Sequence, residues 1–262
     1  MPNRDSYLEG TPSWVDLATT DVDAAQAFYS ALFGWEWETN ETDQPDNPYH
    51  MAQLDGRAAA GLMQQAQEQV DMGLPPLWSV YLTVEDAEAT VGKVEAAGGS
   101  VMAPAFDVMD AGRMAVVVDP TGGVVCLWQP KEHPGCEIVN EPGAFTWAEL
   151  QTPDQDACTE FFAKTVGWDS GAAEMPGLGQ MTFWKVAGED VASGMNPPME
   201  GIPPHWQPYF AVADCDAACE QVAALGGSVL APPMDAPPGR MATVADSTGG
   251  IFSVIALAEQ PA

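Results

Sequence analysis

The chain carries very little positive charge. Its 262 residues include 8 Lys and Arg against 38 Asp and Glu, which gives a formal net charge of −30 at pH 7. An acidic surface of this kind repels phosphate backbones and anionic lipid, so we expect neither nucleic acid nor a membrane as a partner. The excess of acids is typical of a well-solvated surface.

Other features are also missing. No segment has the roughly 18 consecutive apolar residues of a transmembrane helix, and the first residues lack the apolar core of a signal peptide. The five cysteines are odd in number and have no zinc-type spacing, as expected of free thiols in a reducing compartment. Together these absences predict a cytoplasmic protein.

What the chain does have is a long internal repeat. The segment Trp14–Trp35 returns without a gap as Trp147–Trp168. A repeat of this length indicates a duplicated domain, because the units of a solenoid are much shorter. We therefore predict two domains, residues 1–130 and 143–262, joined by a Pro- and Gly-containing linker at 131–142.

Each half shows the same order of elements twice. The first half opens with a strand at Trp14–Thr19, followed by a helix between Asp21, which is suited to cap it, and Gly34, which is suited to end it. Three strand-like runs follow, and then a second strand, helix and three strands repeat this order. Each domain is therefore predicted to be an α+β unit of two βαβββ modules.

Short motifs link this order to a known family. They are Phe28-Tyr29 and Phe33-Gly34-Trp35 after the first strand, Val84-Glu85-Asp86 before the second helix, and Asp119-Pro-Thr-Gly-Gly123 before the last strand. Repeated in the second half, this arrangement resembles the vicinal oxygen chelate superfamily, which includes glyoxalase I, bleomycin resistance proteins, fosfomycin-modifying enzymes and extradiol dioxygenases. The resemblance covers nearly the whole chain. It implies that the two modules of each domain form an open eight-stranded cup that holds the ligand.

The resemblance also implies where metal ligands would stand. Metal-dependent members carry His, Glu or Gln on the first and last strand of each module. The corresponding places hold Trp14, Ser79 and Cys126 in the first half, and Trp147, Gln207 and Ser253 in the second. An indole offers no lone pair, and one thiol or one amide cannot hold an ion alone. We therefore predict no metal and no cofactor, which argues against metal-dependent glyoxalase or dioxygenase chemistry.

Strand alternation places acids beside these positions. Asp16 and Glu149 share the strand face of the two tryptophans, so each could act as a hydrogen-bond acceptor or a general base in its cup. The commoner arrangement for such an acid is a structural pairing with an arginine or a backbone N–H at the rim of the cup, and Arg113 and Arg240, which stand at equivalent places, are the candidate partners. The predicted ligand-binding residues are these two arginines together with Trp14, Ser79, Tyr81, Cys126, Trp128, Trp147, Gln207 and Tyr209.

Two functions remain open. The chain could be a binding module that holds a small apolar or aromatic molecule by stacking, as drug-sequestering members of the family do. It could instead be a metal-independent enzyme that tailors a natural product or detoxifies a reactive carbonyl, with one of the two acids as the base and the nearby arginine stabilising an oxyanion. One domain could also serve only as support, and the second is the candidate because Ile255 replaces a tryptophan there. The expected partner is a small molecule, and the chain is expected to be a monomer or a homodimer.

Overall fold

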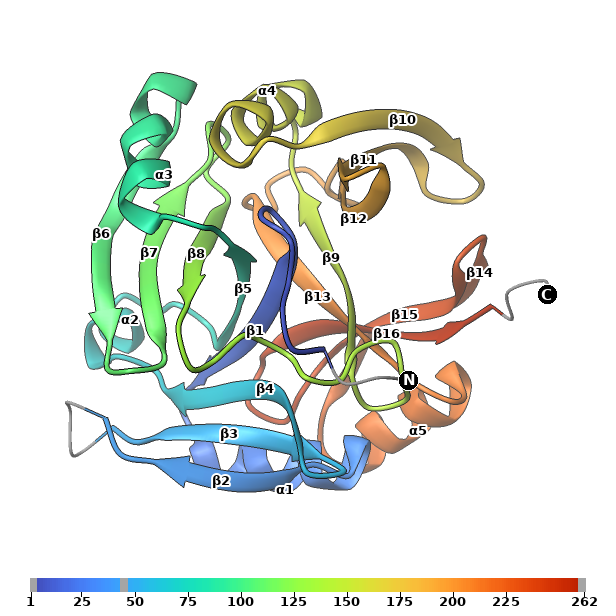
Figure 1. The fold of residues 1–262 in the computed structure, drawn as a ribbon. Coiled ribbons are helices and arrows are strands. Elements are labelled where there is room, and N and C mark those ends of the chain that lie inside the picture. The colour runs from blue at the N-terminus through green and yellow to red at the C-terminus, as the bar shows by residue number, and fades with distance from the viewer. Residues whose placement is uncertain (1–3, 43–46, 259–262) are drawn as a thin grey trace.

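The computed structural model describes residues 4–42 and 47–258, and it contains two eight-stranded mixed sheets (Figure 1). The predicted domain ends at 1–3 and 259–262 lie outside the described residues. The strands of the first sheet are β1 (Pro12–Thr19), β2 (Glu36–Asn40), β3 (Tyr49–Leu54), β4 (Arg57–Gln64), β5 (Leu77–Thr83), β6 (Ser100–Val108), β7 (Gly112–Val118) and β8 (Val124–Pro130). Those of the second are β9 (Phe145–Gln151), β10 (Asp169–Met175), β11 (Gly179–Val186), β12 (Glu189–Met195), β13 (His205–Ala211), β14 (Ser228–Ala236), β15 (Gly239–Ala245) and β16 (Ile251–Leu257).

The helices complete the four modules. They are α1 (Val22–Phe33), α3 (Ala87–Val94), α4 (Gln155–Val166) and α5 (Cys215–Ala224), with the short α2 (Gln67–Asp71) and a 3₁₀ turn at Glu95–Ala97 as additions that the sequence pattern did not predict. Each of the four main helices begins at an aspartate whose side chain accepts a hydrogen bond from a backbone N–H three residues later, as at Asp21. Gly34 ends α1 with φ of 75°, a conformation that glycine adopts without strain. The described helices are all too short or too polar to span a bilayer.

The two sheets have the same topology. The strand order is β2-β3-β4-β1-β5-β8-β7-β6 in the first sheet and β10-β11-β12-β9-β13-β16-β15-β14 in the second. The opening strands of the two modules, β1 and β5, pair antiparallel at the centre of the first sheet, and each is parallel to the last strand of its own module. This confirms the predicted α+β fold of two tandem domains, each built from two βαβββ modules.

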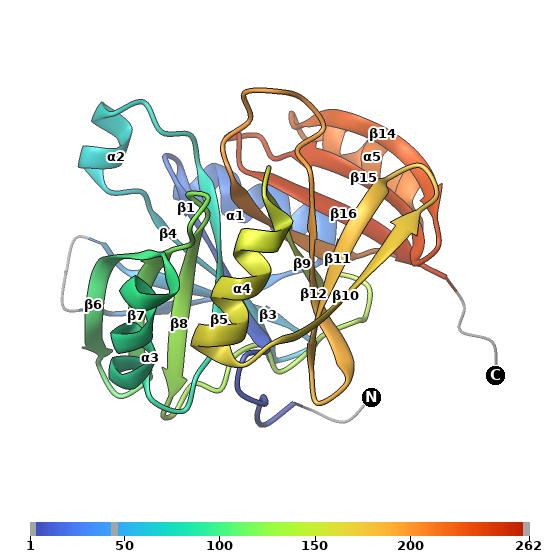
Figure 2. The same cartoon turned by 90° about the horizontal axis from the view of Figure 1, so that it is seen from above.

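The helices join the two domains. Helix α3 lies beside α4 (Figure 2), and α1 lies beside α5. The ring of Phe33 on α1 stands 5.2 Å from that of Phe210 on β13, and Phe28 contacts Phe252 on β16. The helices of one domain therefore bury apolar side chains against the sheet of the other, and one large hydrophobic cluster spans both domains.

Candidate ligand-binding cups

The first cup lies over the centre of its sheet. Trp14 on β1 stands opposite Tyr81 on β5, and Asp16 stands opposite Ser79, so alternation along both strands turns these side chains to one face. The cavity above this face has a volume of about 540 Å³. Its lining consists of Trp14, Asp16, Asn40, Glu41, Thr42, Tyr49, Met51, Met63, Tyr81, Val108, Met109, Asp110, Ala111, Met114, Trp128, Glu132 and His133.

Asp16 is the buried polar centre of this cup. Its side chain is only 3% exposed, and its Oδ2 accepts hydrogen bonds from the hydroxyls of Tyr81 at 2.6 Å and Tyr49 at 3.2 Å. Burial raises the pKa of Asp16, while the hydrogen bonds from Tyr81, Tyr49 and Ser79 act in the opposite direction. No Lys or Arg within the described part of the chain forms an ion pair with this carboxyl.

Tyr49 connects the carboxyl to the predicted tryptophan. The indole N–H of Trp14 donates to the Tyr49 hydroxyl at 2.8 Å, and this hydroxyl in turn donates to Asp16. The hydroxyl occupies space left by Gly61 on β4, where an added Cβ would lie 1.8 Å from the Tyr49 oxygen. The sequence reasoning missed Tyr49, because it comes from a third strand whose register with β1 is not visible in the repeat.

Two further rings close one side of the first cup. His133 lies against Trp14 with ring centroids 4.3 Å apart, and the Trp128 indole N–H donates to the His133 carbonyl at 2.9 Å. Burial lowers the pKa of the His133 imidazole to about 4, so this ring is neutral at pH 7. His133 falls in the segment between the two sheets and has no counterpart in the repeat, so nothing in the sequence pointed to it.

The second cup contains an equivalent network. Glu149 on β9 is 2% exposed and accepts hydrogen bonds from the Tyr209 hydroxyl at 3.0 Å and the Ser193 hydroxyl at 3.5 Å. The Trp147 indole N–H donates to Ser193 at 2.9 Å. Burial raises the pKa of Glu149 to about 7, against the smaller opposing effect of the two hydroxyls. The cavity beside Glu149 has a volume of about 260 Å³, and it shares Thr146, Trp147, Asp190, Pro238 and Leu257 with a further cavity of about 720 Å³.

The bridging hydroxyls of the two cups come from different strands. Ser193 on β12 pairs with Glu149 in the same way as Gly61 on β4 pairs with Asp16. The serine side chain therefore occupies the position where Tyr49, on the neighbouring strand β3, places its hydroxyl in the first cup. The two domains therefore form the same chain of hydrogen bonds, from tryptophan through hydroxyl to carboxyl, and only the residue that supplies the bridging hydroxyl does not correspond in the repeat.

The places of the family's metal ligands do not offer a suitable set of donors. Burial and the nearby Asp16 raise the pKa of the Cys126 thiol, which keeps it protonated. In the second cup, Gln207 is held by Gln151 at 3.2 Å and also bonds Ser253. Across residues 4–42 and 47–258, no group of three or more His, Cys, Asp or Glu side chains is arranged to hold a metal ion. A divalent cation needs several convergent donors, so the residues at these places do not fit one.

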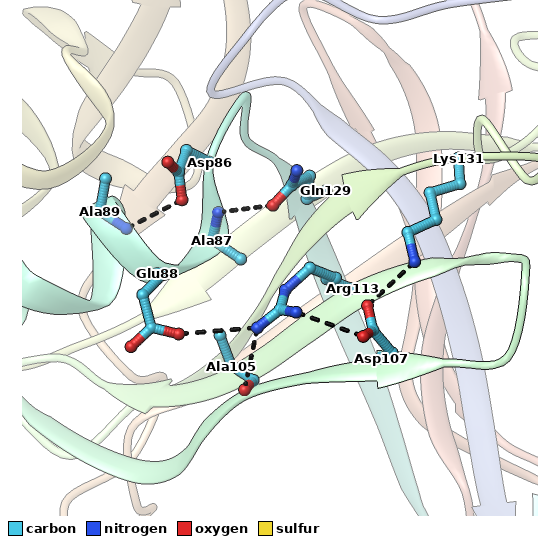
Figure 3. Close-up of polar contacts among 9 residues, drawn as sticks. All are labelled: Asp86, Ala87, Glu88, Ala89, Ala105, Asp107, Arg113, Gln129 and Lys131. Carbon is cyan, nitrogen blue, oxygen red and sulfur yellow. Dashed lines mark hydrogen bonds and ion pairs between the residues drawn. The ribbon is translucent and has the colours of Figure 1, made fainter.

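The expected pairing of the two arginines with the cup carboxyls is wrong. Arg113 lies on the outer side of β7, where it pairs with Asp107 at 3.3 Å and Glu88 at 3.6 Å (Figure 3). Arg240 occupies the corresponding place and bonds Asp216 on α5. Alternation explains both positions, because the following residue on each strand, a methionine, lines the cup. Neither arginine lies on its cavity wall.

The other predicted residues are arranged as follows. The structure brings Trp14, Asp16, Tyr81 and Trp128 together on the wall of the first cavity, and Trp147, Glu149 and Tyr209 on the wall of the second. Ser79, Cys126 and Gln207 lie next to these residues in the sheets but do not line either cavity. Their roles in binding or catalysis stay predictions.

Comparison with known proteins identifies one family model and several relatives that match most of the chain. The family model described as the Glyoxalase/Bleomycin resistance protein/Dioxygenase superfamily matches residues 11–127 and 144–253. The chain is 44% identical over 261 residues to "Putative glyoxylase CFP32" of Mycobacterium tuberculosis, covering 99% of this chain and 100% of the relative. It is 35% identical over 267 residues to "Anthracycline biosynthesis protein DnrV" of Streptomyces peucetius, covering 97% and 95%.

Solved structures show the same fold. The Mn(II)-bound glyoxalase from Novosphingobium aromaticivorans superposes with a TM-score of 0.63 at 14% identity, covering 95% of this chain and 83% of that one. The 2,3-dioxygenase LapB from Pseudomonas sp. KL28 gives 0.64 at 16% identity, covering 98% and 96%. Both family-model segments and both curated relatives confirm the resemblance predicted from the motifs. The chain is a tandem two-domain member of the glyoxalase/bleomycin resistance protein/dioxygenase superfamily.

Proposed function

We propose that the first cup binds a small apolar or aromatic molecule without the help of a metal ion. One observation carries this proposal: a cavity of about 540 Å³, lined largely by aromatic and methionine side chains, surrounds a single buried carboxyl. Binding sites for small molecules are usually of this size and combine an apolar wall with a few polar groups. The rings supply contact area, and the carboxyl and its hydroxyls orient the ligand.

The name of one relative supports this class of ligand. This relative is named for anthracycline biosynthesis, and the aromatic core of an anthracycline is a flat polycyclic system of the kind that stacks on indole and phenol rings. Four methionines in the lining, Met51, Met63, Met109 and Met114, can adapt to the edges of such a molecule because their side chains are flexible and polarisable.

A pair of matched variants tests the site. Nile red, a neutral aromatic dye that fluoresces in apolar surroundings, is titrated into the wild type, Met114→Trp and Met241→Trp. These methionines line the first and second cavity at equivalent strand positions. We expect Met114→Trp to weaken dye binding by about tenfold or more by filling the cavity, and Met241→Trp to have a much smaller effect. Equal losses, or no loss with either variant, would contradict the proposal.

A metal-independent enzyme is the second candidate, and the carboxyl of Glu149 favours it. A general base works best with a pKa near the working pH, and burial raises the pKa of Glu149 to about 7. Because Arg240 bonds Asp216 away from the cavity, the arginine expected to stabilise an oxyanion is not available for that role.

The name of the glyoxylase relative suggests methylglyoxal with a thiol as a first substrate to test. Loss of turnover in Glu149→Gln or Asp16→Asn, with dye binding retained, would favour the enzyme over the binding module.

A further inference from the structure

We propose that the first cup selects an organic cation, a molecule whose apolar body carries a protonated or quaternary amine. This inference rests on the proposed function, since it names the class of ligand that the same cup takes. Three features of the cup point to it: a cage of aromatic rings, a buried carboxyl without a cationic partner, and an acidic mouth.

The aromatic cage is continuous. The rings of Tyr81 and Trp128 stand 6.2 Å apart at a steep angle, and Trp128 lies 5.9 Å from His133, which contacts Trp14 at 4.3 Å. Tyr49 joins the cage through its 2.8 Å hydrogen bond with the Trp14 indole. These rings line the cavity, and an ammonium group over the face of an aromatic ring is attracted by its quadrupole, most strongly where water is excluded.

The carboxyl inside the cage lacks a compensating charge. Asp16 is 3% exposed, and its partners among the described residues are the neutral hydroxyls of Tyr81, Tyr49 and Ser79. Taking an ionised carboxyl out of water is costly unless a positive charge accompanies it. Because the chain provides no such charge in the described cavity wall, a ligand ammonium beside Asp16 would supply it.

The mouth of the cavity carries negative charge, as its buried carboxyl does. Glu41, Asp110 and Glu132 also line it, and its described lining contains no Lys or Arg. The nearby Lys131 and Arg113 are held by Asp107 on the outer side of the sheet (Figure 3). The local field therefore attracts a cation to the opening and repels an anion.

The second cup lacks two of these features. Ile255 stands where the first cup has Trp128, so its ring cage is incomplete. Asp190, the other acid in the lining of that cavity, pairs with Lys185. The preference for a cation is therefore expected in the first cup and not in the second.

Three probes of similar size and different charge test this inference. Phenyltrimethylammonium, its neutral isostere tert-butylbenzene, and benzoate are each used to displace Nile red from the wild type. We expect the cation to bind at least about tenfold more tightly than the neutral isostere, and benzoate to bind most weakly. Asp16→Asn and Trp128→Ile should each reduce the ratio of cation to neutral affinity. Glu88→Gln, which removes one charge from the outer face of the same domain, should leave it unchanged.

The outcomes distinguish a failure of the cation preference from a failure of the proposed binding function. If tert-butylbenzene displaces the dye as well as the cation does, the preference for a cation is wrong while binding of apolar molecules stands. The same conclusion follows if both Asp16→Asn and Trp128→Ile, shown by urea denaturation to be folded, keep the wild-type ratio. If no probe displaces the dye and Met114→Trp does not weaken its binding, the proposed function fails as well.

Discussion

The two cups build the same hydrogen-bond network in different ways. In each, an indole N–H donates to a hydroxyl, the hydroxyl bonds a buried carboxyl, and a tyrosine from the neighbouring strand bonds it too. The bridging hydroxyl comes from Tyr49 in the first cup and from Ser193 in the second, where the first has Gly61. The hydrogen bonds are kept although the residue that supplies the bridging hydroxyl differs. This indicates that both domains depend on the network as a whole.

The space beside the network differs between the cups. The cavity beside Asp16 has a volume of about 540 Å³, whereas the cavity beside Glu149 has about 260 Å³ and shares Trp147 and Asp190 with a further cavity of about 720 Å³ that does not include Glu149 in its lining. The first is closed by Trp128 and His133, whereas Ile255 stands in the second at the place of the tryptophan. Both cups therefore contain the same network, but different residues line the cavity around it. We expect the two cups to bind different ligands.

The largest predicted effect concerns the carboxyl of the second cup. Burial raises the pKa of Glu149 from 4.5 to about 7, so the folded protein holds this proton to a higher pH than the unfolded chain does. Its contribution to stability is complete below about pH 4.5 and is lost as the pH rises through 7. Relative to Glu149→Gln, the wild type should lose about 3 kcal/mol of unfolding free energy between pH 4.5 and pH 8.

Urea denaturation of both proteins at a series of pH values measures this difference. Asp16→Asn provides the matched experiment in the first cup, where burial also raises the pKa of the carboxyl, so the same direction is expected. A difference between wild type and Glu149→Gln that does not change with pH would show that folding does not raise the pKa of Glu149.

A smaller effect is expected from exchanging the bridging residues. Gly61→Ser alone should cost about 2 kcal/mol, because the new side chain meets the Tyr49 hydroxyl. Combining it with Tyr49→Met copies the second cup, where Met181 and Ser193 stand at these places. The double variant should recover more than half of the loss in urea denaturation. If the two changes are simply additive, the two networks are not interchangeable.

The smallest effect concerns the contact between the domains. This contact occurs twice because of the repeat, and its two copies differ by one hydroxyl. The Trp78 indole N–H donates to the Tyr29 hydroxyl, which donates to Asp246 at 2.7 Å. At the equivalent contact Phe162 lacks the hydroxyl, and the described structure shows no hydrogen-bond partner for two buried atoms, Asp119 Oδ2 and Trp206 Nε1.

Restoring that hydroxyl should stabilise the protein. Phe162→Tyr is expected to raise the free energy of unfolding by about 1 kcal/mol, because it supplies a partner to both buried atoms. The reverse change, Tyr29→Phe, should lower it by about 1 kcal/mol or more. Thermal unfolding of the two variants checks both signs, and a lower melting temperature for Phe162→Tyr would mean that the contact has no room for the oxygen.

The fold and the centre of each cup could be predicted because they depend on local and repeated signals. Aspartate caps, the glycine at the end of α1 and the alternation along β1 are short-range features, and the repeat shows each of them twice. The same alternation placed Trp14 and Asp16 on one face, and both line the first cavity.

The parts that could not be predicted depend on the pairing of distant strands. Tyr49 reaches Asp16 only because β3 and β4 bring it over Gly61, and no sequence pattern gives that register. His133 lies in a segment without a repeat partner. For Arg113 the sequence does contain the information, because alternation along β7 places Arg113 and the adjacent Met114, which lines the cavity, on opposite faces of the sheet.

The most direct test of the account is whether the first cup binds its ligand without a metal. Nile red is titrated into protein whose metal content has been measured by mass spectrometry, first after treatment with EDTA and then with added Mn²⁺. We predict binding of one dye molecule at the same affinity in both conditions, with Met114→Trp weakening both equally. Binding that disappears with EDTA and returns with Mn²⁺ would contradict the account, because the residues at the family's ligand places would then hold a metal after all.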